Sequence, residues 1–301
     1  MDKRALTSHI VSLETLEGLT HAYAQISSNR MKNIRKSVLS NRQFLDDLNG
    51  IFKDLRLSYR REVIKLLKEK QKKRGRNKEK DQKETVTFLS HNGKTVSVLL
   101  SANTGLYGEL VPQTFYSFLK DWREQGTEAT IIGKLGLSLF LEEAKGKPYT
   151  FFDYPDYGGD SSKLSDIVAH LVQYEKIRLY HGKFVNLIRQ EPAVSDLAAE
   201  TPIAKFDPNQ KEEEGDKFLF EPTLEEILVF FETEMFGSIF EQTLKESQLA
   251  KFASRMFAMD TAGENIKELL KKMRLEKLRL SHYINNKVQL DALSGSVRFQ
   301  R

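Results

Sequence analysis

The chain has 301 residues, with 47 Lys and Arg against 42 Asp and Glu, and a net charge of +5 at pH 7. The absence of Cys excludes a disulfide framework, cysteine-ligated metals and thiol chemistry. A mean hydropathy of −0.48, without an apolar run of about 18 residues, predicts a soluble protein with no membrane-spanning helix. The first residues lack an apolar signal core, so we expect the chain to stay in the cytoplasm.

Residues 1–84 predict a long helix with a basic extension. Apolar residues recur there at three- and four-residue steps, as in Leu6, Ile10 and Leu13. Residues 60–84 hold 12 Lys or Arg and 5 Asp or Glu, a net of +7, which leaves −2 on the rest of the chain. Such a run is typical of a solvated helix extension or loop, and alternatively of an electrostatic contact for nucleic acid, anionic lipid or an acidic partner. The candidates for that contact are Lys70, Lys72, Lys73, Arg74 and Arg76.

Residues 85–222 predict an α/β domain. All seven prolines lie between positions 112 and 222, and short runs rich in β-branched and aromatic residues alternate there with helical patterns. The expected strands are 85–90, 95–101, 128–133, 176–180, 183–188 and 216–220, and the expected helices are 112–126 and 162–175. A strand–helix–strand order of this length indicates a Rossmann-like, mostly parallel sheet. His181–Gly182, between two of the strands, suggests a hairpin edge.

Residues 223–301 predict a second long helix. Pro222 precedes Thr223, and Glu226 completes a T-x-x-E capping box. An apolar stripe follows at helical spacing, and some 70 helical residues would span roughly 105 Å. No globular core of this chain's size encloses such a rod. The two terminal helices therefore most simply pack together as an antiparallel coiled coil.

The motifs of intrinsic catalysis are missing. The glycine strings GLYGE (105–109) and GKLG (133–136) lack the Lys-Ser/Thr ending of a phosphate-binding loop. The six histidines are scattered without metal-ligand spacing, and the adjacent carboxylates lie in patterns typical of solvated segments. We therefore expect no catalytic residue, no metal site and no cofactor bound by this chain.

Five stretches, in order along the chain, resemble the gamma subunit of the F-type ATP synthase, the central rotor shaft. SRMFAMDTAGENIKELL (254–270) is similar to the family's C-terminal helix signature, which is the most specific of the five. The others are SLETLEGLTHAYAQISSNRM (12–31), SANTGLYGELVPQTF (101–115), IIGKLG (131–136) and FEPTLEEIL (220–228). The resemblance spans nearly the whole chain and agrees with the architecture expected from periodicity alone.

The chain departs from the family pattern at several positions. Arg30 stands where the family has Lys, Tyr107 replaces a loop cysteine, and Lys251–Phe252 replace a Glu-His pair. Near the end of the chain, Gln, Thr and Glu of the family become Leu280, Ile284 and Asn286. Those polar residues help the family's shaft to catch the surrounding ring, so their loss suggests a divergent synthase or a specialised relative.

The resemblance implies a non-catalytic subunit of a proton-transporting ATP synthase, which couples rotation of a membrane ring to nucleotide binding on other subunits. The implied contacts with the alpha and beta subunits are Arg30, Met31, Arg255, Met256, Met259, Asp260, Lys277 and Arg279. The implied turn motif of the domain is Gly105, Leu106 and Gly108. ATP, ADP and magnesium would bind to the partner subunits.

The implied partners are three alpha and three beta subunits per shaft, the epsilon subunit and the membrane c-ring, at the cytoplasmic face of the cell membrane. The basic segment 60–84 would then face that ring or the lipid head groups. Two alternatives stay open: a gamma-like shaft of a rotary ATPase adapted to sodium transport or motility, and an adaptor that binds nucleic acid or a scaffold through residues 60–84.

Overall fold

The computed structural model describes residues 3–59, 89, 91–198 and 223–298. The chain forms two compact units: residues 1–29 with 255–301, and residues 30–254. We call them the helix-pair unit and the domain unit. Two long helices, α1 (Lys3–Ser58) and α6 (Leu224–Arg298), each contribute one segment to both units.

In the helix-pair unit, α1 and α6 pack through an apolar seam. The Arg274 guanidinium donates to the Glu14 carboxylate at 2.7 Å, and the Lys3 ammonium donates to the Ser281 hydroxyl at 3.3 Å. Earlier residues of α1 thus meet later residues of α6, so the two helices are antiparallel. The seam consists of Leu6, Ile10 and Leu270, which are buried, and of Leu13, Ile266 and Met273, which pack against them. The predicted antiparallel coiled coil is confirmed in this unit.

The same antiparallel pairing occurs independently in the domain unit. The Asn41 side chain donates to the Ser238 carbonyl oxygen at 3.1 Å, and the Phe52 and Phe231 rings lie 5.6 Å apart. The buried members of this second seam are Leu48, Phe52, Leu55, Leu228 and Met235. Its apolar residues recur at three- and four-residue steps, as the sequence predicted.

Helix α6 begins at the predicted capping box. The Glu226 amide donates to the Thr223 hydroxyl at 3.4 Å, and the Thr223 amide donates to the Glu226 carboxylate at 3.3 Å. This reciprocal pair satisfies two of the backbone donors that a helix leaves unpaired at its start.

The domain unit contains a five-stranded sheet of order β3-β2-β1-β4-β5. Its strands are β1 (Thr95–Leu100), β2 (Glu128–Ile132), β3 (Thr150–Phe152), β4 (Lys176–Phe184) and β5 (Gln190–Ala198). Strands β1 to β4 are parallel, and β5 pairs with β4 antiparallel. The predicted mostly parallel sheet is confirmed.

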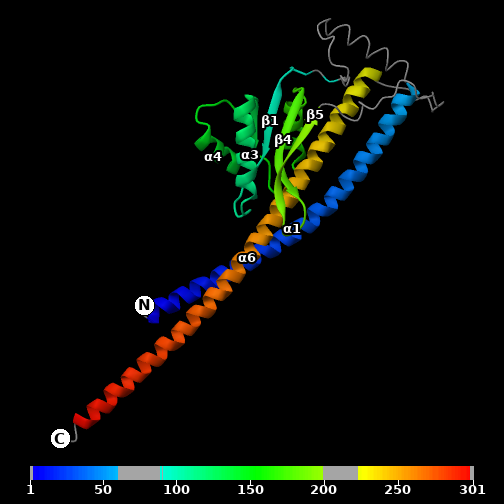
Figure 1. Ribbon diagram of the computed structural model, residues 1–301. Helices are drawn as coiled ribbons and strands as arrows, with labels where there is room; N and C mark the ends of the chain where they lie inside the picture. Colours follow the sequence, from blue (N-terminus) through cyan, green and yellow to red (C-terminus); the bar gives the residue numbers. More distant parts are fainter. Residues whose placement is uncertain (1–2, 60–88, 90, 199–222, 299–301) are drawn as a thin grey trace. The chain divides into compact units, whose positions relative to one another are not determined.

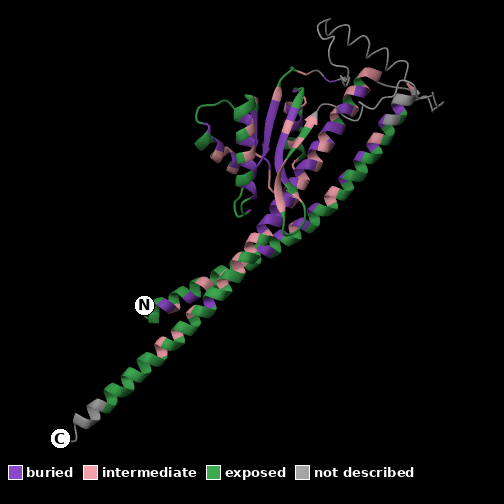
Figure 2. Cartoon of the chain, viewed as in Figure 1, coloured by how far each residue is buried: buried purple, intermediate pink, exposed green. Residues whose placement is uncertain are grey.

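Helices cover both faces of this sheet (Figure 1). Val96, Val98 and Leu100 of β1 face a core shared with α5 and with α6, whereas Leu99 faces a second core shared with α3 and α4. This alternation follows from the two-residue period of a strand and leaves β1 buried on both sides. The helices are α3 (Leu110–Gln125), α4 (Lys134–Glu143) and α5 (Ser161–Leu171). Figure 2 shows the buried residues concentrated along these contact faces.

Several expected elements are present and three were missed. The strands expected at 95–101 and 128–133 are β1 and β2, and the helices expected at 112–126 and 162–175 are α3 and α5. Helix α3 ends, as predicted, at Gly126, which has a φ of 62°. The sequence analysis did not anticipate β3, α4 or β5.

The hairpin predicted at His181–Gly182 is wrong. Both residues lie inside the continuous strand β4, and the turn falls between Phe184 and Gln190, where the Asn186 side chain accepts from the backbone of Ile188 and Arg189. Residues 185–188, expected as the end of a strand, therefore belong to this turn. Gly182 serves close packing instead, because a Cβ there would lie 2.8 Å from the Leu110 side chain.

Three expectations fall outside the described residues: the basic segment 60–84 with Lys70, Lys72, Lys73, Arg74 and Arg76, the strand at 85–90 apart from Leu89, and the strand at 216–220. The predicted domain boundaries near residues 84 and 222 fall in the same ranges and stay predictions. Within the described part of the chain, no helix combines the length and apolarity needed to cross a membrane.

Candidate functional site: the junction of the α/β domain with the long helices

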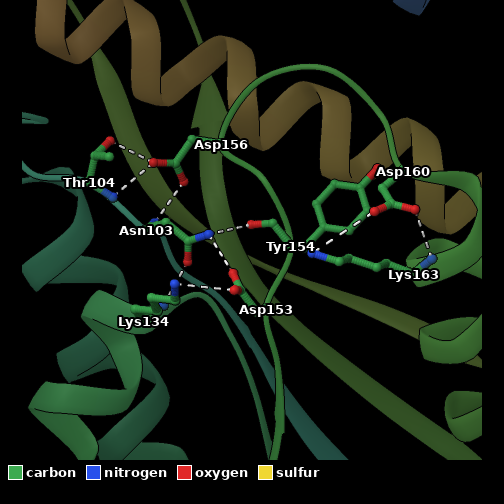
Figure 3. Close-up of polar contacts among 8 residues, drawn as sticks. All are labelled: Asn103, Thr104, Lys134, Asp153, Tyr154, Asp156, Asp160 and Lys163. Atoms are coloured by element: carbon green, nitrogen blue, oxygen red, sulfur yellow. Dashed lines mark hydrogen bonds and ion pairs between the residues drawn. The ribbon is translucent and has the colours of Figure 1, made fainter.

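The loops that follow β1, β2 and β3 meet at the carboxyl edge of the parallel sheet, and Asn103 joins all three (Figure 3). Its side-chain amide donates to the Asp153 carboxylate at 2.7 Å and to the Tyr154 carbonyl oxygen at 3.0 Å. Its side-chain oxygen accepts from the Lys134 backbone amide at 2.9 Å. The hydrogen bond that Asp153 accepts from Asn103, with the ammonium of Lys134 3.2 Å away, lowers the pKa of the Asp153 carboxyl.

Asp156 fixes the same edge from the other side. Its carboxylate accepts from the backbone amides of Asn103 and Thr104, both at 2.8 Å, and from the Thr104 hydroxyl at 2.6 Å. Two backbone donors and a hydroxyl around one carboxylate form a strong, charge-assisted set. In many open α/β sheets this edge holds a nucleotide phosphate. Here the backbone amides of Asn103 and Thr104 donate to the chain's own Asp156, and the backbone amide of Lys134 donates to Asn103.

One face of α6 is clamped onto these loops. Gln248, Lys251 and Ser254 are buried and follow one another at three-residue spacing. Their side chains donate to the backbone carbonyl oxygens of Pro155 at 3.2 Å, Ser101 at 2.6 Å and Tyr107 at 2.7 Å, respectively. The loops after β1 and β3 are thus tied to the same turns of α6.

Helix α1 reaches the junction through aromatic rings. The Phe252 ring is fully buried and contacts the rings of Tyr107 and Tyr157 edge-to-face at 6.0 and 6.1 Å. The guanidinium carbon of Arg30 lies 4.9 Å from the Tyr157 ring centroid and 5.4 Å from that of Phe252. The Asn33 side chain donates to the Tyr157 hydroxyl at 3.0 Å. Two segments distant in sequence, one from α1 and one from α6, therefore converge on Tyr157.

The predicted partner-contact residues fall into both units. Arg30 and the buried Met31 belong to the domain unit, and the structure brings Arg30 into the aromatic junction. The other six belong to the helix-pair unit. Among them Arg255 is buried, Met256, Met259 and Lys277 are half-buried, and Asp260 and Arg279 are exposed. No observation on this chain alone tests their contact with a partner, which stays a prediction.

The predicted turn motif lies in the loop between β1 and α3. Leu106 has a φ of 70°, a conformation strained for a side chain with a Cβ, and it is more than half exposed. Gly108 has a φ of 57°, which only glycine adopts without penalty. Leu106 and Gly108 thus both have left-handed backbone in this loop, and the importance of the motif stays a prediction.

The sequence analysis missed most of the junction. Asn103, Asp156 and Tyr157 carried no recognisable motif, and Lys251 and Phe252 were noted only as departures from the family pattern. The usable signal was the string of Asp, Tyr, Pro and Gly at 153–160, which is typical of an ordered loop after a strand. Among the described residues, no group of three or more His, Asp or Glu is arranged to hold a metal ion.

His181 is a buried titratable group beside this junction. Its Nε2 lies 2.8 Å from the Ser195 hydroxyl, and its Nδ1 lies 3.2 Å from the Gly182 carbonyl oxygen, which can only accept. Burial lowers the pKa of His181, although the charge of Glu246 acts in the opposite direction. Burial therefore disfavours the charged form of this imidazole in the folded protein.

We expect the free energy of unfolding to fall as the pH drops below about 6.5, because the unfolded chain then binds a proton that the folded chain rejects. His181→Gln should flatten this dependence in urea titrations at pH 5 to 7. Half-buried His170, whose pKa burial also lowers, contributes with the same sign. His21→Gln, at an exposed position of α1, is the matched control. An unchanged slope in the His181 variant would contradict the assignment.

The fold consists of two long antiparallel helices and an α/β domain clamped onto α6. Two solved structures have this fold. A chain of the central stalk and c-ring of the Tetrahymena thermophila mitochondrial ATP synthase is 17% identical, with a TM-score of 0.53 over 81% of this chain and 99% of that one. A chain of the Euglena gracilis mitochondrial ATP synthase is 11% identical, with a TM-score of 0.50 over 90% and 95%.

The family model described as ATP synthase matches residues 2–280, and the chain belongs to this family, as a member of its gamma-chain group. The ATP synthase gamma chain of Mycoplasma capricolum is 24% identical over 277 residues, which are 90% of this chain and 89% of that protein. The gamma chain of Pelotomaculum thermopropionicum is 22% identical over 287 residues, 92% and 91% of the two chains. The resemblance inferred from the sequence is confirmed.

Proposed function

We propose that this chain is the central rotor shaft of an F-type ATP synthase or ATPase, which couples rotation of a membrane ion ring to the nucleotide states of an alpha/beta catalytic ring. The observation that carries the proposal is the antiparallel pairing of α1 and α6 in each unit, with an α/β domain packed on α6, in a chain of the gamma family. The chain itself performs no chemistry in this proposal. An asymmetric shaft acts by contacting each catalytic subunit differently, so that its angle favours a different state in each.

The exposed apolar residues of the helix-pair unit support a surrounding partner. From Leu275 to Leu293, α6 exposes many large apolar side chains. They are Leu275, Leu278, Tyr283, Ile284, Val288, Leu290 and Leu293. Apolar surface of this extent on a soluble segment marks an interaction site. We assign it to the alpha and beta subunits, three of each per shaft, with ATP, ADP and magnesium bound there and not here.

The partner-contact residues predicted from the sequence form two groups, one exposed to solvent and one buried within the chain. Asp260 and Arg279 are exposed and Lys277 is half-exposed, so they are free to reach the ring. Met31 and Arg255 are buried within the chain and leave little surface for a partner. We propose that they keep the shaft's geometry while the exposed residues make the contacts.

The domain unit would face the epsilon subunit and the c-ring, with the complex held peripherally at the cytoplasmic face of the membrane. The transported ion is chosen in the membrane subunits, so the proposal is the same for a proton or a sodium ring. Family membership favours the shaft over the adaptor that would use residues 60–84.

The test is reconstitution with ATP synthase alpha and beta subunits from the same organism. We expect a 3:3:1 complex in which a bead attached to the shaft rotates when ATP is added. The control is the alpha and beta mixture without this chain, which should show no rotation. A chain that stays monomeric beside competent alpha and beta subunits would overturn the proposal.

A further inference from the structure

Three side chains meet where the domain unit ends along both long helices. The boundary of this unit falls between Asn29 and Arg30 on α1 and between Ser254 and Arg255 on α6. Arg30 is therefore the first residue of α1 in the unit, and Phe252 lies in the last turn of α6 within it. Tyr157, from the loop between β3 and α5, contacts both.

The geometry suits a guanidinium in particular. Arg30 lies within 6 Å of two ring centroids, and these two rings are nearly perpendicular, at 86°. A planar, weakly hydrated guanidinium stacks on such rings, whereas the compact ammonium of Lys holds its water more strongly. Phe252 is fully buried whereas Tyr157 is 38% exposed, so the contact is shielded from solvent and salt on its Phe252 side.

The departures from the family pattern gather at this point. Arg30 stands in place of Lys, Phe252 in place of His and Tyr107 in place of a cysteine, and the Phe252 ring contacts both other side chains. Lys251, in place of Glu, donates to the Ser101 carbonyl oxygen on the same side of the domain. Residues far apart in sequence thus meet in one cation–aromatic cluster.

Tyr157 is in turn anchored to the sheet. Its neighbour Asp156 accepts from the backbone of Asn103 and Thr104 at the end of β1, and Pro155 accepts from Gln248 of α6. A displacement of the sheet is therefore passed through a short, hydrogen-bonded loop to the Tyr157 ring, and from there to both helices.

We infer that Arg30, Tyr157 and Phe252 form a latch that fixes the α/β domain to both long helices, and that Arg30 is the positioning residue of this latch. In the rotary complex, the latch transmits torque from the α/β domain to α1 and α6, because the domain cannot move independently of these helices. This last step rests on the proposed function, whereas the latch itself is a property of the chain alone.

The first experiment uses the full chain by itself. Since the chain has no Cys, spin labels can be placed on cysteines introduced at Asp47 of α1 and Lys120 of α3, two exposed sites in the domain unit. We expect a narrow distance distribution between the labels in the parent chain. Arg30→Lys and Phe252→Leu should broaden it, with about a fivefold larger population of released domain. Arg35→Lys, at an exposed site on the same helix, is the matched control and should leave it unchanged.

Both single variants keep a helix-compatible side chain, so we expect them to fold, with an apparent Tm lowered by about 2–4 °C. Lys at position 30 keeps the charge, so a broadening in Arg30→Lys reports the loss of stacking and not of charge. A distribution as narrow as that of the parent chain in both variants would overturn the latch.

The second experiment uses the reconstituted complex. We expect Arg30→Lys to lower ion-driven ATP synthesis while ATP hydrolysis is retained. A domain that can move relative to the long helices would rotate partly without turning them. Normal synthesis together with a broadened distribution would overturn the role in torque. Failure of the parent chain to assemble would instead sink the proposed function, and the result on the isolated chain would still decide the latch.

Discussion

Replacing Gly133 by alanine is expected to destabilise the protein by about 3 kcal/mol. Gly133 joins β2 to α4 with a φ of 105°, a conformation that side chains with a Cβ rarely adopt. An added Cβ would also lie 2.8 Å from the backbone nitrogen and 2.9 Å from the carbonyl oxygen of Ala102. Backbone atoms at this distance cannot rotate away, so the loop after β1 would have to move.

The matched control is Gly126→Ala at the end of α3. Gly126 has a φ of 62° but no atom within 4 Å of the added Cβ, so it carries the conformational penalty without the collision. We expect it to cost about 1 kcal/mol. Urea unfolding of both variants measures the difference, provided that the slope with denaturant is unchanged. If both variants lost the same free energy of unfolding, the collision of the added Cβ with Ala102 would make no contribution to the destabilisation.

The consequence of Gly133→Ala would reach the junction. Ala102 directly precedes Asn103, which joins the loops after β1, β2 and β3. A shift of Ala102 would therefore misplace the amides that hold Asp156 and loosen the anchor of Tyr157. The variant should broaden the same label distance that reports on the latch.

The long helices and the central strands were predictable because each is specified locally. Both ends of the chain lack proline and have apolar side chains at three- and four-residue steps, which predicts α1 and α6. A capping box marks the start of α6. Strands β1 and β2 read as short runs rich in β-branched residues between turn signals, since they are buried on both faces.

The missed elements depend on tertiary context. Strand β3 has only three residues and is held by its pairing with β2, and β5 contains Pro192, which an edge strand tolerates. His181–Gly182 resembled a turn because a glycine needed for close packing looks the same in sequence as one needed for a bend. No local pattern separates the two.

The junction could not be predicted for a related reason. Its members come from positions 30, 103, 156, 157 and 252, and each is an ordinary residue in its own segment. The folded sheet edge places the Asn103 amide beside Asp153, and the packing of α1 with α6 and the loop after β3 places the Arg30 guanidinium near two rings. The sequence resemblance noted Arg30 and Phe252 only as separate departures, and the structure places the Arg30 guanidinium carbon 5.4 Å from the Phe252 ring centroid.

Replacing Leu270 by alanine is expected to destabilise the helix-pair unit by about 2–5 kcal/mol. Leu270 is 2% exposed and packs against Leu6 and Ile10 in a seam with few other buried residues. A cavity there cannot be refilled by a neighbouring layer, because the unit consists of two helices. The unit should open locally while the sheet of the domain unit stays folded.

Leu269→Ala is the matched control, since Leu269 is the adjacent residue on α6 and is 45% exposed. Its effect should stay within about 0.5 kcal/mol. Hydrogen exchange of the α1 amides between residues 5 and 29 is the measurement, and in Leu270→Ala we expect it to accelerate about thirtyfold or more. In the reconstituted complex, an opened pair should transmit torque poorly, so ATP synthesis should fall further than ATP hydrolysis. If these amides were as protected from exchange in Leu270→Ala as in Leu269→Ala, the seam would not be what holds this unit together. The two helices would then need partner subunits to form a stiff shaft.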